Sequence, residues 1–572
     1  MKFFILLLAI LSYGSLVFVS CDNNLNNNLN IQAWSGSAYP KPENFPEKRT
    51  LDAKGLPSTA LSISGGGTTA FNIAMGVLSV LNDNDLLKYV RYLGGVSGGG
   101  WAASVYTYTQ NTKNDKVFLG PIVQPKDIND FTVNTMDPNC ARSFTTRCYT
   151  SCGLAAFNNQ SNNANAQTAT TDTIYDIYFS TIGVPKNAIF TYNATTRASI
   201  LKRNPSLVNE TFLLPAKPSR PFMLISFALV GPSYLIPIPN RSQLNISFQE
   251  MSSMYFGSPK LGTVSYNKGA ESQLIGGYME SYIFGANASK TGLKPGGVAG
   301  TLSVPAPSSL FSSVSYVTAG GFVDGSLFLS TQFPAKYYWG ERYFSPSQVI
   351  PKPAVTNQVT DGGFSQNTMV APFLQRGIKN IIAVFSTSVP LQPASVWNVN
   401  KNPKNIDYIT SDLACLFGAL PDGYASIFNY QDDQVFSFSD WPRVVKTLQA
   451  AQAKGNGIIA TFQLTTVHND WWGINAGFKT SLTIIYNGRL KNWEKQLNAK
   501  YKALLVPAGP DASDLGKTIQ TGPYLGFPNY PVTGGDLTNG QANLGADLVS
   551  LSFTFFNYMH MIFSMYVQVI LS

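Results

Sequence analysis

The sequence predicts an α/β fold with a central, mostly parallel β-sheet that is flanked by helices and interrupted by insertions. Two observations carry this prediction. A β-rich run, a glycine loop, an amphipathic helix, a second β-rich run and a glycine turn follow one another between residues 61 and 100. A similar order returns at residues 357–385. Because strands that alternate with helices form βαβ units, both segments favour parallel strands.

The first unit is the clearer of the two. Residues 61–63 (Leu-Ser-Ile) read as a short strand that leads into Ser-Gly-Gly-Gly at 64–67. Apolar residues then recur at helical spacing over residues 70–87, which predicts an amphipathic helix. Residues 89–93 form a second β-rich run, and the glycine turn at 94–100 follows it directly. The two glycine segments should therefore meet at one edge of the sheet.

The later unit begins at Asp361-Gly362-Gly363, continues as a helical stretch through Leu374, and predicts a buried strand at residues 380–385. No internal repeat or low-complexity linker divides the chain, so we expect one domain over residues 56–543. Beyond the second unit, the patterns predict two helices and two strands, at residues 443–454, 489–504, 457–462 and 481–486.

The composition restricts the possible partners. Of the 572 residues, 44% are apolar and 12% are charged, so a large core is easily formed. The formal charge of +9 favours anionic surfaces such as lipid headgroups. The basic residues form no run, so the sequence argues against nucleic-acid binding.

Both ends of the chain carry segments that we expect to lie outside this domain. Residues 1–21 have the basic start, apolar centre and small exit residues of a signal peptide. Residues 22–55 are rich in Asn, Ser and Pro, and we expect them to be poorly ordered. The apolar tail at residues 544–572 predicts a lipid-anchor signal or a membrane segment, with a core helix as the alternative.

The cysteines and the glycosylation motifs favour the secretory pathway, with a secreted, cell-surface-anchored or lysosomal product. Cleavage near Cys21 would leave four cysteines, which predict two disulfides of undetermined pairing; a lipid-modified Cys21 is the alternative. The remaining cysteines are Cys140, Cys148, Cys152 and Cys415. Asn-x-Ser/Thr motifs begin at Asn159, Asn193, Asn209, Asn240, Asn245 and Asn287.

Ser97 is the candidate nucleophile. It lies where the second β-rich run ends and a helix is expected to begin, within Gly95-Val96-Ser97-Gly98-Gly99. A sharp strand-to-helix turn exposes a serine hydroxyl and needs small neighbours, because its backbone is strained. The upstream loop supplies what a nucleophilic serine requires, since the backbone N–H groups of Gly66 and Gly67 can bind an oxyanion. No Gly-Lys-Ser/Thr follows this loop, which argues against a nucleotide-binding P-loop.

A general base must accept the proton of the serine, and histidine is scarce. The chain contains only His468 and His560. An aspartate is therefore a serious candidate, and Asp361 is the best placed, because it follows a strand-like run and precedes two glycines. Asp324, which precedes Gly325, is its rival.

Together these motifs resemble the catalytic domain of the cytosolic phospholipase A2 and fungal phospholipase B (lysophospholipase) family, which has a patatin-like fold. The resemblance covers roughly residues 58–390 and rests on the glycine motifs at 64–67, 95–101 and 361–363. It implies a Ser–Asp dyad without histidine, formed by Ser97 and Asp361, and an oxyanion hole at Gly66 and Gly67. It also implies a calcium-independent enzyme with no metal and no cofactor.

The same resemblance implies hydrolysis of fatty-acyl esters of phospholipids or lysophospholipids through an acyl-enzyme, at a membrane surface. One position departs from the family. Thr69 stands where the family usually has an arginine that steadies the headgroup phosphate, and a neutral hydroxyl cannot replace a bidentate cation. The headgroup is therefore left open.

Two alternatives remain. Ser97, Asp361 and His468 have the chain order of an α/β-hydrolase triad, although too few strands precede Ser97 for that fold. The chain could also be a catalytically inactive surface glycoprotein on the same scaffold, a reading that Thr69 favours.

Overall fold

The computed structural model describes the central part of the chain. The predicted signal peptide, the apolar tail, Asp324 and the cysteines at 140, 148 and 152 lie outside the described residues, as does His560. The structure describes residues 28–120, 125–127, 174–231, 245–259, 262–266, 270–274, 277–283, 300–306, 310, 312–314, 317, 333–336, 356–387, 389–422, 424, 430–488 and 491–503.

Thirteen strands of the described residues form one large sheet. Its centre is a block of five parallel strands, which confirms the predicted α/β fold with a parallel sheet. In spatial order these are β6 (Phe222–Gly231), β3 (Tyr92–Val96), β2 (Thr59–Ile63), β15 (Asn380–Phe385) and β17 (Lys479–Tyr486).

Antiparallel strands extend this block at both sides, and the sequence did not predict most of them. β16 (Ile458–Thr465) pairs with β17 at one edge. Beyond β6, the order is β7 (Asn245–Ser252), β8 (Tyr255–Ser258), β11 (Gly277–Glu280), β1 (Asn28–Ser35) and β12 (Gly300–Pro305). β14 (Thr356–Asp361) pairs with β6 and with β13 (Phe333–Lys336), which completes the thirteen. Two separate two-stranded sheets are formed by β9 (Gly262–Tyr266) with β10 (Ala270–Leu274), and by β4 (Ile189–Phe190) with β5 (Phe212–Leu213).

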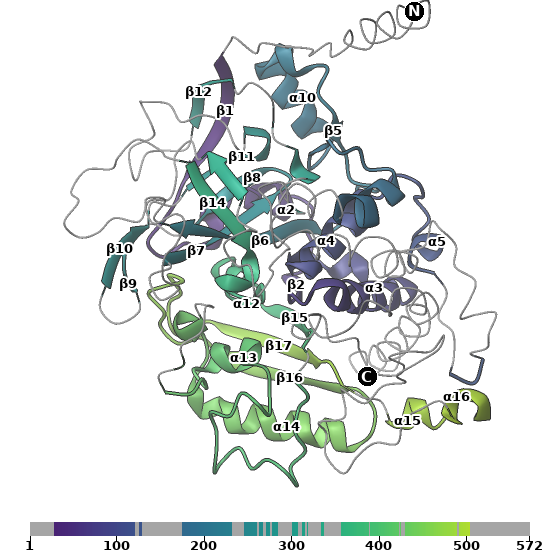
Figure 1. The fold of residues 1–572 in the computed structure, drawn as a ribbon. Coiled ribbons are helices and arrows are strands. Elements are labelled where there is room, and N and C mark those ends of the chain that lie inside the picture. Colours follow the sequence, from purple (N-terminus) through teal and green to yellow (C-terminus); the bar gives the residue numbers. More distant parts are fainter. Residues whose placement is uncertain are drawn as a thin grey trace, which may run out of the picture.

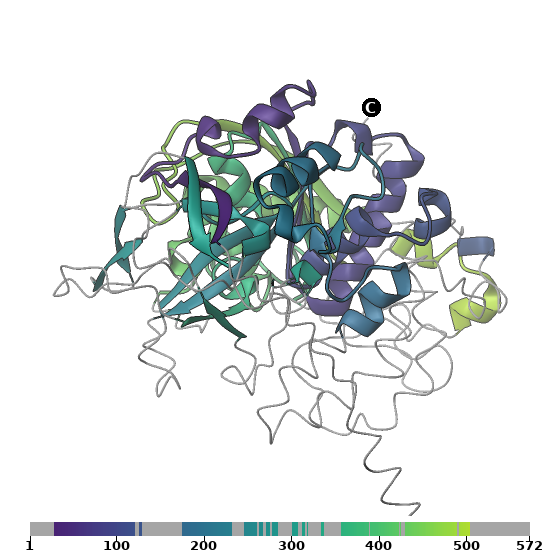
Figure 2. The same ribbon diagram turned by 90° about the horizontal axis from the view of Figure 1, so that it is seen from above.

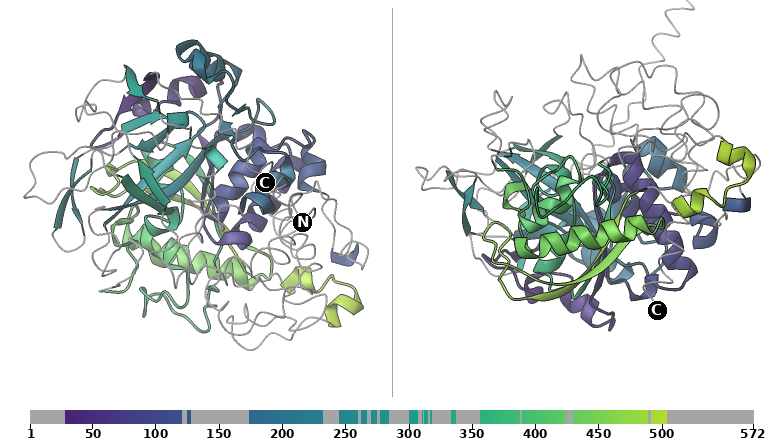
Figure 3. Two further views of the ribbon diagram at one scale, coloured as in Figure 1. Left: turned by 45° about the horizontal axis from the view of Figure 1, so that its top comes forward. Right: turned by 90° about the horizontal axis from the view of Figure 1, so that it is seen from below.

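Helices cover the sheet (Figure 1). The teal strands of the β6–β8 region lie to one side of the purple-blue helices α3 and α4 (Figure 2), and α14 runs along β16 and β17 (Figure 3). None of the helices in the described ranges has the length and apolarity needed to cross a bilayer. The α-helices are α2 (Lys48–Asp52), α3 (Gly67–Asp83), α4 (Gly98–Tyr108), α5 (Asp115–Leu119), α10 (Ala194–Arg203), α12 (Val370–Gln375), α13 (Ser411–Ala414), α14 (Trp441–Ala453), α15 (Lys491–Glu494) and α16 (Ala499–Ala503).

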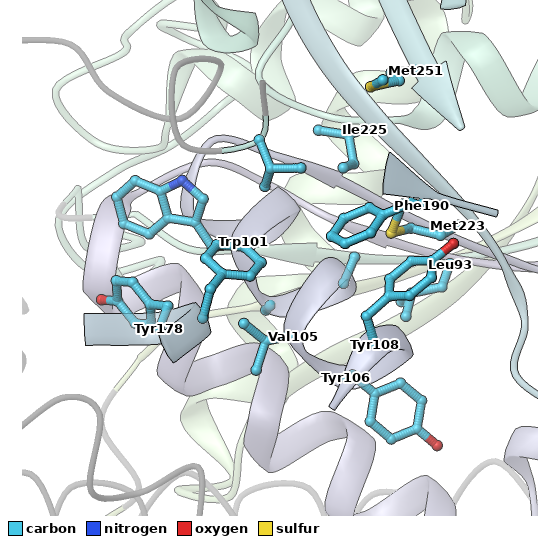
Figure 4. Packing of buried hydrophobic residues seen from close by; sticks show 14 of the residues in the cluster. Leu93, Trp101, Val105, Tyr106, Tyr108, Tyr178, Phe190, Met223, Ile225 and Met251 are labelled. Atoms are coloured by element: carbon cyan, nitrogen blue, oxygen red, sulfur yellow. The ribbon is translucent and has the colours of Figure 1, made fainter. Parts of the chain in front are cut away.

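The helix that follows Ser97 is fixed by aromatic packing. Every residue of α4 is buried, and its side chains point in several directions: Trp101 lies beside Tyr178, and Tyr108 lies beside Phe190 (Figure 4). Trp101 contacts Tyr178 with ring centroids 5.1 Å apart, and Tyr108 stacks on Phe190 at 3.8 Å. Such pairs add to the free energy gained by burying apolar area. These two contacts fix α4 near both of its ends.

The register of β6 determines how the two halves of the site meet. Its first half pairs with β3 as far as Ser226, which lies opposite Val96. Its next residue, Phe227, pairs with Asp361, the last residue of β14. β3 and β14 therefore end against consecutive residues of one strand, and the residues at and after their ends are brought together.

The expectation that residues 22–55 are poorly ordered is wrong for residues 28–55. Residues 28–35 form β1, which pairs with β11 and β12. Its buried residues alternate with polar ones, at Leu29, Ile31 and Ala33. The asparagine-rich composition concealed this strand, because asparagine is uncommon in strands. In β1 the asparagines lie on the exposed face.

Two further expectations need correction. Cys415 is a free, buried thiol, so the prediction that all four remaining cysteines form disulfides is wrong for this residue. The helix predicted at residues 489–504 is broken into α15 and α16. By contrast, the helix predicted at residues 443–454 is confirmed as α14, and the strand predicted at 380–385 is confirmed as β15.

A buried ion cluster joins the N-terminal segment to the sheet. The guanidinium of Arg376, just after α12, donates through Nε to Glu47 at 2.9 Å and through Nη2 to Glu250. It also lies 4.0 Å from the ring of Phe45, and Tyr255 bonds to both Arg376 and Glu47. Burial raises the pKa of Glu250, an effect that Arg376 opposes. The cluster is favourable only while all its members are present.

We expect Arg376→Met to lower the free energy of unfolding by about 3–5 kcal/mol, because two buried carboxylates lose their cation. Urea denaturation would measure this. Lys404→Met is the matched control, since Lys404 pairs with Asp422 at the surface and should change stability little. Equal stability of the Arg376 variant and the wild type would contradict the prediction.

Candidate active site

Ser97 occupies the sharp turn that the sequence predicted. It lies between the end of β3 and the start of α4, with φ 53° and ψ −126°. A positive φ is unfavourable for a residue with a side chain and is common at functional sites. A Cβ added to Gly95 would overlap the carbonyl oxygen of Gly99, and one added to Gly98 would overlap that of Gly67. The glycines are therefore required by the close approach of backbone segments.

Asp361 lies beside this serine. Ser97 Oγ donates a hydrogen bond to Asp361 Oδ2 at 2.7 Å, across 264 residues of sequence. The other carboxylate oxygen accepts from the backbone N–H of Gly363 at 2.8 Å, in the 3-10 turn Gly362–Phe364. Both side chains are buried. The carboxylate is thus held by one backbone bond while it contacts the serine hydroxyl.

Burial raises the pKa of Asp361 to about 6, and the hydrogen bonds from Ser97 and Gly363 oppose that rise. A carboxyl group with this pKa is ionised at neutral pH, yet it is a stronger base than an exposed aspartate. It can therefore accept the proton of the serine hydroxyl.

The glycine loop lies against the serine, as expected. A Cβ added to Gly65 would lie 3.1 Å from Ser97 Cβ. Gly66 has φ 137°, Gly67 has φ 55°, and α3 begins at Gly67. The first N–H groups of a helix have no carbonyl partner within it and favour negative charge. The loop thus places a helix N-terminus next to the nucleophile.

Asn367 is a residue of this site whose role was not predicted from the sequence. Its Oδ1 accepts a hydrogen bond from the N–H of Gly65 at 3.0 Å, and its Nδ2 donates to Asp412 at 2.8 Å. The signal available in the sequence was its position in the turn that begins at Asp361. Asp412 lies far along the chain and had no such signal.

His468 does not join the dyad. Thr465, at the end of β16, pairs with Lys479 at the start of β17, so His468 follows the edge of the sheet opposite to Ser97. Its Nε2 is 3.2 Å from Asp470 and 3.5 Å from the hydroxyl of Tyr39, at the surface. The Ser97–Asp361–His468 triad is therefore wrong.

Within the described ranges, no group of three or more His, Cys, Asp or Glu side chains is arranged to hold a metal ion. Thr69 lies in the first turn of α3.

Comparisons with known proteins agree with the predicted resemblance. Residues 61–216 match the family model of patatin-like phospholipases. The human cytosolic phospholipase A2 gamma is 44% identical over 62 residues, which are 11% of this chain and 12% of that protein. The mouse protein of the same name is 42% identical over 73 residues, 13% of this chain and 12% of that protein.

Solved structures with detectable similarity include human GIVD cytosolic phospholipase A2. Its TM-score is 0.37 at 11% identity, and the alignment covers 91% of this chain and 61% of that one. A complex of the same protein with methyl gamma-linolenyl fluorophosphonate gives a TM-score of 0.35 at 12% identity, over 91% of this chain and 60% of that one. The present chain thus spans less than two thirds of these proteins.

The geometry predicts that Ser97 reacts with an alkyl fluorophosphonate, and that the rate depends on pH. Asp361 acts as a base only when ionised, so the rate constant should fall tenfold per pH unit below about 6, the pKa of Asp361. Mass spectrometry of the Ser97 peptide would follow the labelling.

Asp361→Asn should slow this labelling by about 100-fold or more and remove the pH step. Asp470→Asn, an exposed aspartate beside His468, is the control and should behave as the wild type. Unchanged labelling of the Asp361 variant would show that another group activates the serine.

Proposed function

We propose that the chain is a serine-dependent lipid acyl hydrolase that cleaves fatty-acyl esters of phospholipids or lysophospholipids through an acyl-enzyme. The observation that carries this proposal is the 2.7 Å hydrogen bond between Ser97 and Asp361. The match of residues 61–216 to patatin-like phospholipases supports lipid esters as the substrate class.

Acylation begins with the transfer of the proton from Ser97 Oγ to Asp361 Oδ2. The oxygen attacks the ester carbonyl carbon, and the resulting oxyanion accepts hydrogen bonds from the N–H groups of Gly66 and Gly67. As the carbonyl re-forms, the bond to the alcohol breaks. Asp361 returns its proton to the departing alcohol oxygen, and the fatty-acyl group remains on Ser97.

Deacylation repeats these steps with water. Asp361 takes a proton from the water molecule, and the oxygen of that water attacks the acyl carbon. The same N–H groups stabilise the second oxyanion. Its collapse breaks the bond to Ser97 Oγ, which regains the proton from Asp361. The fatty acid leaves, and the dyad returns to its starting state. No metal or cofactor enters these steps.

The headgroup is the least constrained part of the proposal. Thr69 in α3 occupies the position at which an arginine was expected. We therefore include lysophospholipids beside diacyl phospholipids, as for a phospholipase A2, a phospholipase B or a lysophospholipase. The formal charge of +9 supports binding to an anionic membrane surface. We place the protein in the secretory pathway on account of residues 1–21 and the glycosylation motifs.

The test is release of fatty acid from phosphatidylcholine and from lysophosphatidylcholine vesicles or micelles. We expect Ser97→Ala and Asp361→Ala each to lower kcat by at least 1,000-fold, roughly the loss that follows removal of a nucleophile or its base. His468→Ala is the control, and its activity should stay within about twofold of wild type.

Absence of release by the intact, folded protein on both lipids would favour the inactive-glycoprotein alternative. Loss of activity in the His468 variant would instead restore the histidine triad. Release that persists in Ser97→Ala would contradict the proposed nucleophile.

A further inference from the structure

The side chain of Asn367 lies between the glycine loop at residues 64–67 and the turn at residues 361–363 that carries Asp361. Its Oδ1 accepts the N–H of Gly65 at 3.0 Å, and its backbone oxygen is 3.3 Å from the same nitrogen. A Cβ on Gly65 would overlap this Oδ1, and a Cβ on Gly363 would lie 3.0 Å from it. One amide oxygen therefore contacts both glycine segments of the site.

A carboxamide can bind in two orientations that differ by a flip of oxygen and nitrogen, so something must select one. Asn367 Nδ2 donates to Asp412 Oδ2 at 2.8 Å. An ionised carboxylate only accepts hydrogen bonds, so it requires the NH2 group to face it. The carbonyl oxygen then faces Gly65. In the flipped orientation, the NH2 group would face the N–H of Gly65, and two donors would oppose each other.

Asp412 is itself fixed by hydrogen bonds that link it to its own helix N-cap and, through that residue, to β17. It lies in α13, whose N-cap Thr410 accepts the N–H of Asp412 at 3.4 Å. The N–H of Thr410 donates to the hydroxyl of Tyr486 at 2.9 Å, and the hydroxyl of Tyr430 bonds to the Asp412 carboxyl. The carboxylate therefore has a fixed position relative to the sheet.

The charge state of Asp412 fits this role at neutral pH. Burial raises its pKa to about 6, and the hydrogen bonds from Asn367, Tyr430 and Thr410 lower it. The other titratable groups near it are Tyr430, Tyr486, Cys415 and Asp433, and burial raises the pKa of each of them. With a pKa of about 6, the Asp412 carboxyl is ionised at neutral pH and accepts the hydrogen bond from Asn367.

We infer that Asp412, acting through Asn367, is a positioning residue that holds Gly65, and with it the oxyanion donors at Gly66 and Gly67, against Ser97. This inference rests on the proposed function. Oxyanion donors act over a few tenths of an ångström, and the loss of one such donor costs about 100- to 1,000-fold in kcat. A loosened loop should therefore lower kcat and leave KM nearly unchanged.

An exchange of the two side chains gives the sharpest test. In Asn367→Asp, two carboxylates face each other, and we expect kcat to fall about 100-fold. Adding Asp412→Asn restores one donor and one acceptor with their positions exchanged. The carboxylate at position 367 then accepts hydrogen bonds from the N–H of Gly65 and from the amide at position 412. We expect the double variant to recover to within about fivefold of wild-type kcat, with KM constant throughout.

Two further variants separate this effect from general damage. Asp412→Leu removes the acceptor, frees the amide to flip, and should lower kcat at least tenfold. Asp433→Asn is the matched control, because Asp433 is also buried but accepts a hydrogen bond from Trp472 at 2.8 Å. It should keep wild-type kcat. Wild-type kcat in Asn367→Asp and Asp412→Leu, or a double variant no better than Asn367→Asp, would overturn the inference.

Hydrogen exchange of the peptide that contains residues 64–67 tests the same contact without an assay of catalysis. We expect the exchange rate of the Gly65 amide to rise at least tenfold in Asn367→Asp and Asp412→Leu, and to return to the wild-type rate in the double variant. The thermal unfolding midpoints should stay unchanged. If the wild type shows no Ser97-dependent ester turnover, the proposed function fails, and exchange alone decides the inference. Unchanged exchange in folded variants would overturn it.

Discussion

The arrangement of the site depends on one constraint, the pairing of β6 with two strands that end toward each other. β3 stops opposite Ser226 and β14 stops opposite Phe227, so the separation of Ser97 and Asp361 is set by a single step along one strand. A register shift of one residue would move every side chain of β14 to the other face. The central position of β6, between β3 and β7, keeps that register fixed.

This arrangement stores free energy that the rest of the fold must offset. Ser97 has a positive φ, which costs on the order of 1–3 kcal/mol for a residue with a side chain. Burial raises the pKa of Asp361 from 3.8 to about 6, so ionising it in the folded protein costs on the order of 3 kcal/mol. That cost is absent below about pH 4 and is complete above about pH 6, because the folded state holds the proton more tightly. The buried aromatic packing of α4 and the parallel strands supply the compensating stability.

The sequence predicted those features that are encoded locally. The strand, glycine loop, helix and glycine turn at residues 61–100 have clear periodicities, and Ser97 and Asp361 stood out because glycines surround them. Features that arise from contacts between distant residues escaped prediction. The Asn367–Asp412 bond joins two elements with no shared motif, and β1 is a strand only because β11 and β12 supply its partners. Cys415 counted toward a disulfide in composition alone, whereas the fold buries it.

The buried cluster around Arg376 joins regions of the chain that lie on both sides of the matched segment. The family model matches residues 61–216, yet Glu47 lies before that segment, and Glu250 and Arg376 lie after it. Loss of any one of these three charges would leave a charge unpaired in the interior, so the regions on both sides of the matched segment depend on each other for stability. A single crossover at a point between residues 47 and 250 would separate Glu47 from Glu250 and Arg376, and it would succeed only where both parents carry the same cluster. The segment that such a crossover must leave intact therefore extends well beyond residues 61–216 on both sides.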